Sequence, residues 1–468
     1  MPIKDSFGDV HLDVSTGAER HASAVDPESP FRILLLGDFS GHAAQGAKSS
    51  AGWKPVEIDR DNFEEVLARV GPGFAGMRFQ ELDDFHPDRI YQESKLFQDL
   101  REVRRKLEKP STFGEASAQI RKWAGEPAAE PQRPALPNAA SGVSLLDSIL
   151  DIEEPVARPP ATSRGGLQAF VESVVAPHTV PAENPELPRL RKMVDAESSS
   201  RMQALLHHST FQALESAWRA VFQLVRAIET GSQMKIYLLD VSKAELPDGL
   251  STLVEETVET GDDPWSVVAG NYTFRRTVED AEMLSRLAKV MSFAGAPFLG
   301  EADPGNSGTE SEEATQKWER LRQLPEACWI GLAMPRVLLR LPYGKKTDPL
   351  ESFDFEEMPG APLHQQYLWG SPAFACVRLL AEAFADDAWD MRPGKYAEID
   401  RLPVHVYEAG GEKCVKPCAE VLLTDRDIDW ILDQGYMALA SIRGRDAVRL
   451  VRFQSIAKPL ARLAGRWD

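Results

Sequence analysis

The chain has 468 residues, of which 53 are Lys or Arg and 72 are Asp or Glu, so its formal net charge is −19. Phosphate backbones and anionic lipid surfaces attract clustered basic residues, so this balance argues against nucleic acid and membrane surfaces as partners. Hydrophobic residues make up 43% of the chain. That fraction suffices for at least one sizeable core, and the length suggests two to four domains.

The sequence also bears on the compartment. No apolar run approaches the ~18–20 residues that span a bilayer. The N-terminal stretch MPIKDSFGDV has no apolar region of the kind found in a secretory signal. Four cysteines are too few for a disulfide framework in a chain of this length. We therefore expect a cytoplasmic protein that is not inserted into a membrane.

The sequence pattern of the N-terminal part predicts a polar arm followed by a small lobe. The run FRILLLG at 31–37 is almost wholly apolar and is bounded by proline and glycine, which is typical of a buried strand. Apolar residues recur at helical spacing over 62–70. A second helix is expected at 84–107, where aspartate and proline suit the cap and the first turn. We therefore place an N-terminal arm at 1–30 and a compact α/β lobe at 31–123.

The composition shifts after this lobe. Eleven of the 33 prolines lie between residues 125 and 188, so we interpret 124–194 as mainly linker. Within it, the stretch SLLDSILD at 144–151 has helical spacing. A short amphipathic helix between proline-rich flanks suits a peptide that binds a groove in a partner, or it packs on its own protein. Its apolar face would consist of Leu145, Leu146, Ile149 and Leu150.

Residues 195–468 alternate between helical and strand patterns, as in an α/β domain. Helices are expected at 211–228, 278–292, 312–322, 371–384 and 425–433. Strands are expected at 235–241, 265–269, 297–299, 329–332, 336–341, 404–407, 420–423 and 448–453. The predicted fold class is therefore α/β, with a small N-terminal lobe joined by a proline-rich linker to a larger domain.

No motif for catalysis or for a bound cofactor is complete. The stretch GKKT at 344–347 lacks the upstream glycine of a phosphate-binding loop. His207 and His208 are adjacent and point to different faces of a helix, so packing or capping is favoured over a shared metal ion. Cys414 and Cys418 have no second pair to complete a zinc site. We therefore predict a non-enzymatic protein with no catalytic residue, no cofactor and no metal.

Two stretches of the first lobe, PFRILLLGDFSG at 30–41 and FQELDDFHPD at 79–88, resemble a known family. They are similar to the first two motifs of the small sheath subunit (TssB/VipA) of bacterial type VI secretion systems. The motif positions in these two stretches are Gly37, Asp38, Phe39, Phe85 and Pro87.

From residue 144 onwards the chain instead resembles the large sheath subunit (TssC/VipB) of the same systems. The most characteristic stretch is LHHSTFQALESAWR at 206–219. The stretches LLRLPYG at 338–344, YLWG at 367–370 and QSIAKP at 454–459 follow in the family's order. Each stretch is short, but the ordered set is specific. Its motif positions include His207, His208, Trp218, Tyr343 and Trp369.

The resemblance implies a fold like that of contractile-tail sheaths and a structural role. The implied partners are other sheath-type subunits, an inner-tube protein and baseplate proteins, and further copies of this chain are an additional candidate. An AAA+ recycling unfoldase is implied as well. In this family it engages the counterpart of the helix at 144–151, which favours the partner-binding interpretation of that helix.

One departure from the family concerns the C-terminus. The typical large subunit continues well beyond the region that 454–459 resembles, whereas this sequence stops at Asp468. Late strands contribute to pairing between subunits by strand addition. Their absence suits an alternative function, a capping, initiating or regulatory paralogue that forms no contractile sheath. The pattern leaves open whether a partner supplies such strands and whether the N-terminal lobe donates a strand to the larger domain.

Overall fold

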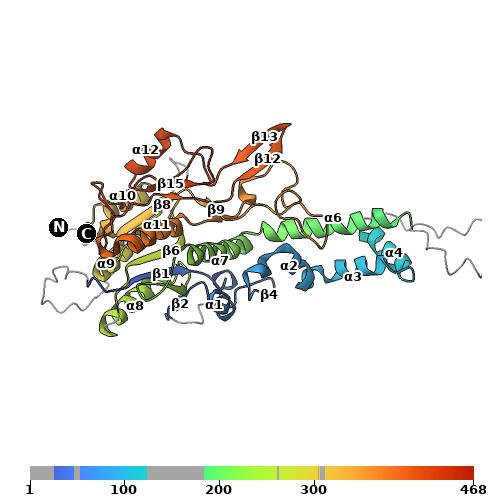
Figure 1. The fold of residues 1–468 in the computed structure, drawn as a ribbon, viewed down its shortest axis with the longest axis horizontal. Coiled ribbons are helices and arrows are strands. Elements are labelled where there is room, and N and C mark those ends of the chain that lie inside the picture. The colour runs from blue at the N-terminus through green and yellow to red at the C-terminus, as the bar shows by residue number, and fades with distance from the viewer. Residues whose placement is uncertain (1–25, 47–52, 124–183, 261–262, 304, 306–310) are drawn as a thin grey trace, which may run out of the picture. The chain divides into compact units, whose positions relative to one another are not determined.

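The computed structural model describes residues 26–46, 53–123, 184–260, 263–303, 305 and 311–468 (Figure 1). Most of the predicted arm at 1–30 and the whole helix predicted at 144–151 lie outside these residues. The chain divides into two compact units. The sheet unit comprises residues 1–89, 204–349 and 356–468, and the helical unit comprises residues 90–203 and 350–355.

A nine-stranded mixed sheet forms the centre of the sheet unit (Figure 1). Its strand order is β11-β15-β14-β8-β7-β6-β1-β5-β2. The six strands from β14 to β5 pair in parallel, whereas β2, β15 and β11 pair antiparallel with their neighbours. The strands span Phe31–Gly37 (β1), Val56–Ile58 (β2), Met234–Asp240 (β5), Val267–Phe274 (β6), Phe298–Ala302 (β7), Ile330–Met334 (β8), Glu398–Ile399 (β11), Met437–Ser441 (β14) and Val448–Leu450 (β15).

Three small antiparallel pairs accompany this sheet. They are Gly73–Phe74 (β3) with Met77–Arg78 (β4), Val337–Leu338 (β9) with Trp369–Gly370 (β10), and His405–Ala409 (β12) with Glu412–Lys416 (β13). The helices of the sheet unit are Phe63–Val70 (α1), Ser209–Ala227 (α7), Leu246–Thr260 (α8), Val278–Ala294 (α9), Glu312–Arg322 (α10), Pro372–Asp387 (α11) and Asp425–Asp433 (α12). None of the described helices combines the length and apolarity that a membrane crossing requires. Alternating helices and strands confirm the predicted α/β class.

Strand β1 lies inside the main sheet, between β5 and β6. Phe31 packs on Phe384 of α11, with ring centroids 4.7 Å apart. Leu34 and Leu36 belong instead to the core cluster that contains Leu284 of α9. Because successive side chains of a strand point to opposite faces, the two helices cover opposite faces of the sheet. A strand without a polar face is thus buried on both sides, as in parallel sheets generally.

This placement settles the question of strand donation. The N-terminal region supplies β1 to the main sheet in the same chain, and the stretch 31–123, expected as one compact lobe, is divided between the two units. Strands β1 and β2 and helix α1 belong to the sheet unit, whereas the helices at Gln98–Leu107 and Phe113–Trp123 belong to the helical unit. The boundary between the units lies inside the helix at Pro87–Glu93. The physical reason is the composition of β1, because a small two-layer lobe would leave one of its apolar faces in water.

The helical unit contains Gln98–Leu107 (α3), Phe113–Trp123 (α4) and most of Leu187–Leu206 (α6). Within this unit Arg104 of α3 pairs with Asp195 of α6 at 2.6 Å, and Arg121 of α4 pairs with Glu186 at 2.9 Å. Helix α6 begins inside the stretch 124–194 that was predicted as linker. Its early residues Leu190 and Val194 are buried, so their side chains hold this segment in the helical unit despite the nearby prolines.

Two further predictions are wrong. The helix expected at 84–107 is divided into Pro87–Glu93 (α2), a 3-10 turn at Lys95–Phe97 and α3. The Ser94 hydroxyl causes the break, because it accepts a hydrogen bond from the Leu96 amide at 3.1 Å and starts the turn. No strand forms at 420–423, where Val421 and Leu422 are 49% and 60% exposed.

Candidate functional site

Most motif positions taken from the sequence meet around the first half of α7. This helix begins after His208, whose Nδ1 accepts a hydrogen bond from the Thr210 amide at 3.3 Å. One of the unpaired amides at the helix start is thereby satisfied. The apolar face of α7 buries Phe211, Leu214 and Trp218. His208 is therefore a cap, one of the two roles favoured from its position in the sequence.

Trp218 connects α7 to the loop that follows β1. Its indole Nε1 donates a hydrogen bond to the Phe39 carbonyl oxygen at 2.8 Å, and the two rings meet edge to face with centroids 5.7 Å apart. A Cβ atom at Gly37 would lie 3.0 Å from the Phe39 ring. Close packing therefore explains Gly37 and Phe39, whereas the Asp38 carboxylate accepts hydrogen bonds from backbone amides of its own loop.

Phe85 and Pro87 have structural roles near the same helix. The Phe85 ring stacks on Phe79 with centroids 4.2 Å apart and lies 5.9 Å from the Phe211 ring. Pro87 is the first residue of α2, a position at which its missing N–H group is not needed. The second small-subunit motif thus packs on the most characteristic large-subunit motif through Phe211.

A buried set of charged side chains connects α7 with the loops around residues 340 and 357. Arg340 bridges two carboxylates, because its Nε lies 2.7 Å from Glu215 Oε1 and its Nη1 lies 2.7 Å from Glu357 Oε2. Arg219 Nε also lies 2.7 Å from Glu215 Oε1. Glu215 is 0% exposed and Glu357 is 1% exposed. We refer to Glu215, Arg219, Arg340, Tyr343 and Glu357 as the Arg340 network.

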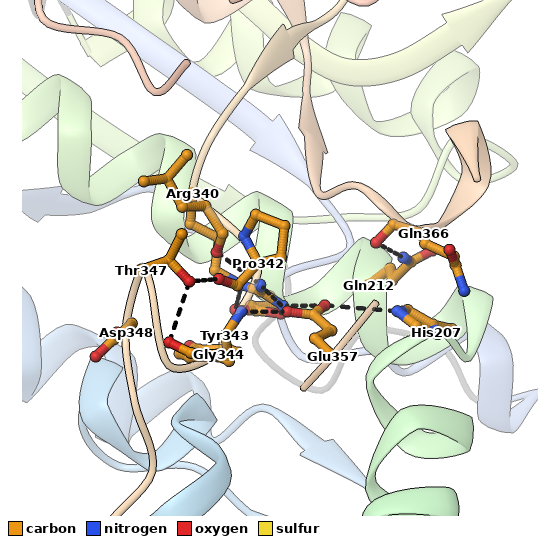
Figure 2. Close-up of polar contacts among 12 residues, drawn as sticks. His207, Gln212, Arg340, Pro342, Tyr343, Gly344, Thr347, Asp348, Glu357 and Gln366 are labelled. Carbon is orange, nitrogen blue, oxygen red and sulfur yellow. Dashed lines mark hydrogen bonds and ion pairs between the residues drawn. The ribbon is translucent and has the colours of Figure 1, made fainter. Parts of the chain in front are cut away.

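Glu357 is held by three groups that face it in Figure 2. Besides Arg340, the Tyr343 amide donates to Glu357 Oε2 at 2.8 Å, and His207 Nε2 lies 3.6 Å from Oε1. The last contact becomes an ion pair only when His207 is protonated. Burial alone would raise the pKa of Glu357, but Arg340 and these donors lower it to about 2. Glu357 is therefore ionised throughout the physiological range.

Tyr343 completes the network. Its ring lies under the Arg340 guanidinium, 4.3 Å from the centroid, and its hydroxyl accepts a hydrogen bond from Arg219 Nη2 at 2.9 Å. Burial raises the pKa of Tyr343 to about 12, although Arg219 and Arg340 act in the opposite direction. The phenol thus stays neutral. Two carboxylates face two guanidinium groups, and the network carries no net charge.

Two other sequence features lie close to this network. Thr347 donates to the carbonyl oxygens of Pro342 and Gly344, so the GKKT stretch forms a turn closed on itself (Figure 2). The Trp369 indole donates to the His364 carbonyl oxygen at 3.1 Å and packs beside Tyr367. These contacts stabilise loops.

Sequence reasoning found Tyr343 and His207 but missed Glu215, Arg219, Arg340 and Glu357. One signal was present in the sequence. Glu215 lies four residues after Phe211 and three before Trp218, so it occupies the apolar face of its helix. A carboxylate at such a position requires a buried basic partner. The helix at 144–151, with Leu145, Leu146, Ile149 and Leu150, lies outside the described residues.

Two protein-family models match the chain. The model of the tail sheath N-terminal domain (VipB, EvpB/VC_A0108) matches residues 189–457. The model described as type VI secretion system, VipA, VC_A0107 or Hcp2 matches residues 10–76. The first match covers more than half of the chain, and both resemblances inferred from the motifs are confirmed.

A sheath protein of known sequence is consistent with these matches. The chain is 31% identical over 301 residues to the type VI secretion system sheath protein TssC1 of Pseudomonas aeruginosa strain PAO1. This similarity covers 57% of the chain and 60% of the relative, so the chain spans about three fifths of that protein's length. Among solved structures, the contracted helical sheath of the anti-feeding prophage matches with 14% identity, 51% coverage of both chains and a TM-score of 0.29. The baseplate of the same particle matches with 14% identity, 54% coverage of both chains and a TM-score of 0.32.

Proposed function

The chain belongs to the tail sheath family of type VI secretion systems, and from this premise we propose that it is a non-enzymatic structural subunit of such a sheath. The observation that supports the proposal most directly is the match of the large-subunit model to residues 189–457, together with the small-subunit match at 10–76. The capping or regulatory paralogue considered above is less well supported, because both matched regions are those of sheath subunits.

The sheet unit suits a structural role. The small-subunit strand β1 is enclosed by large-subunit strands on both sides, and Trp218 ties the following loop to α7. The charged side chains of the Arg340 network pair with one another. Such an arrangement is compatible with a structural role.

The proposed partners follow from this role. They are other sheath-type subunits, further copies of this chain and baseplate proteins, with assembly around or at the end of an inner tube in the cytoplasm. We further propose that an AAA+ unfoldase binds the segment 144–151 through its apolar residues. This part of the proposal rests on the family resemblance and on the amphipathic pattern of the segment.

Assembly tests the main proposal. The purified full-length chain is imaged by negative-stain electron microscopy alone and after mixing with the inner-tube protein from the same secretion gene cluster. We expect ordered rings or tubes, or co-purification with the inner tube. A chain that stays monomeric and binds no apparatus component in pull-downs contradicts the proposal.

The unfoldase proposal needs a separate experiment. The double change Leu146→Asp and Ile149→Asp places charge on the apolar face and is expected to abolish unfoldase binding in a pull-down while leaving Tm unchanged. Ser148→Asp adds one negative charge on another face and serves as the control, which is expected to bind. A sharp fall in Tm for the double variant would show that the helix packs on its own protein.

A further inference from the structure

Asp38, His42 and Asp240 come together at one edge of the main sheet. Asp38 follows the last residue of β1, and Asp240 is the last residue of β5. These strands are parallel neighbours, with Gly37 paired to Asp240 in the register. The carboxyl ends of parallel strands are the usual location of binding sites in α/β sheets. We refer to these residues and Glu245 as the His42 cluster.

Two of the separations among the ligand-type atoms of these residues are close to those between neighbouring ligands of one metal ion. His42 Nδ1 lies 2.9 Å from Asp38 Oδ1 and 3.4 Å from Asp240 Oδ2, and one such atom from each residue lies within 4.8 Å of the others. Zinc bonds to nitrogen and oxygen are about 2.0–2.2 Å long, so tetrahedral neighbours lie roughly 3.3 Å apart. Ser40 Oγ, 2.9 Å from the same nitrogen, lies beside this position.

Each of the three side chains is oriented by a second group. The amides of His42 and Ala43 donate to the two oxygens of Asp38 at 2.9 and 3.1 Å. The Ser40 amide donates to Asp240 Oδ1 at 3.0 Å, which leaves Oδ2 directed at His42. Gly41, between Ser40 and His42 in the chain, adopts a φ of 77°, a left-handed conformation that glycine permits.

Glu245 fixes the tautomer of His42. Its Oε2 lies 2.9 Å from His42 Nε2 and accepts the proton of that nitrogen when the ring is neutral. The lone pair of Nδ1 then points toward Asp38 and Asp240. A carboxylate that holds the far nitrogen of a histidine is the common outer-shell arrangement of metal-binding histidines. Without a cation, the Ser40 hydroxyl, 2.9 Å from Nδ1, is the group that can donate to this lone pair.

The cluster also has more carboxylates than basic groups. Asp38, Asp240 and Glu245 bring three carboxylates to one histidine, and the side chains of Asp240 and His42 are only 7% and 8% exposed. In the described part of the chain, His42 is the one basic side chain within ion-pair distance of either aspartate. Its single positive charge, when present, offsets only one of them. Buried charges are normally paired or bound to metal.

We propose that Asp38, His42 and Asp240 bind one divalent transition-metal ion. Imidazole nitrogen together with carboxylate oxygen favours zinc over magnesium or calcium, which prefer all-oxygen sites. The ion ties the loop after β1 to the end of β5, and it therefore fastens the N-terminal strand to the large-subunit sheet.

Calorimetry on the tag-free full-length chain, freed of metal with a chelator and dialysed into chelator-free buffer, tests the proposal. Titration with zinc chloride is expected to show one saturable site per chain and to raise Tm as the free zinc concentration rises. Magnesium chloride is expected to bind at least about 100-fold more weakly. A cobalt(II) titration should show the visible absorption of a site with nitrogen and oxygen ligands.

Three variants and one control locate the site. His42→Ala and Asp38→Asn each remove a ligand and are expected to abolish saturable binding. Glu245→Gln still accepts the Nε2 proton but lowers the basicity of the ring, so zinc binding should weaken about 10-fold. The control is His364→Ala, because His364 contacts Glu420 at 2.8 Å but is half-exposed elsewhere in the sheet unit.

Each outcome of these titrations either supports the proposal or overturns it. Stoichiometric zinc binding that is lost in the ligand variants and kept in the control supports the proposal. No saturable binding to the parent chain overturns it, and so does binding that persists in both ligand variants. If His42→Ala fails to fold, as judged by circular dichroism in chelator, Asp38→Asn and Glu245→Gln decide the question.

Discussion

The Arg340 network and the His42 cluster are two buried polar groups in the sheet unit, and they differ in charge balance. In the first, two guanidinium groups face two carboxylates, and the Tyr343 phenol is neutral. In the second, the aspartates outnumber the single histidine. The first is therefore complete without any ligand, whereas the second gains stability from a cation.

This difference in charge balance bears on how much each buried charge contributes to stability. A buried ion pair is weak evidence for added stability compared with apolar residues of the same volume. Breaking one is costly, however, because the remaining charge stays in a medium that solvates it poorly. Removing a charge should therefore lower the free energy of unfolding strongly in the balanced network and only slightly in the cluster with excess negative charge. The predictions below test this comparison, beginning with the largest effect.

Arg340→Ala is expected to have the largest effect. The change leaves Glu357 buried without a guanidinium partner and leaves Glu215 with Arg219 alone, so the free energy of unfolding should fall by roughly 3–5 kcal/mol. Urea unfolding at pH 7 measures the loss. The matched control is Arg445→Ala, since Arg445 also pairs with two carboxylates but is 47% exposed. It should leave the urea midpoint nearly unchanged, and equal losses in the two variants would contradict the importance of burial.

Glu357→Gln should change how stability depends on pH. The folded pKa of about 2 lies below the ordinary value of 4.5, so ionised Glu357 contributes stability above pH 4.5 that is lost as pH falls toward 2. This contribution is about 3 kcal/mol at pH 7. The variant should be less stable by about that amount at neutral pH and should lose less stability on acidification.

Urea midpoints at pH 7, 5, 4 and 3 measure this difference. Glu65→Gln is the control, because Glu65 pairs with Arg69 at 3.0 Å but is 76% exposed. Its midpoints should follow those of the parent protein. A constant gap between Glu357→Gln and the parent from pH 7 to pH 3 would show that Glu357 is not the titrating group.

Tyr343→Phe should have a smaller effect. The variant keeps the ring under Arg340 but removes the oxygen that accepts from Arg219, so we expect a loss of about 1–2 kcal/mol in urea unfolding. Tyr396→Phe removes a hydroxyl whose partner is the exposed Asp386 and should change the midpoint very little. A neutral result at Tyr343 would mean that water replaces the lost oxygen.

The sequence allowed the fold class and most elements to be predicted, because strand β1 and helix α7 have clear periodicity. The sequence did not allow the division of the chain into the sheet unit and the helical unit to be predicted. The central place of β1 depends on pairing with β5 and β6, more than 200 residues away in the chain, and periodicity contains no information on pairing over such a distance. The break at Ser94 depends on one hydroxyl contact.

The candidate sites show the same limit. Tyr343 and Asp38 were found from family motifs, but Arg219, which donates to Tyr343, lies on α7, and Asp240, which converges with Asp38 on His42, lies on β5. The motifs gave no indication of these contacts. Glu215 was detectable as a carboxylate on an apolar helix face. His42 was not, since nothing about a histidine in a glycine-rich loop indicates that two carboxylates from different strands converge on it.

Asp240→Asn should have the smallest effect and is the sharpest test of the comparison. With chelator present, the change removes one negative charge from a site with excess negative charge, and the amide oxygen still accepts from Ser40, so we expect a change below about 0.5 kcal/mol. Glu215→Gln makes the same chemical change in the balanced network, where Arg340 and Arg219 lose a counter-charge, and should cost roughly 2–3 kcal/mol. Urea unfolding of both variants in the same buffer measures the difference. Equal losses would mean that charge balance does not distinguish the two sites, because the aspartate would then be as well compensated as the glutamate.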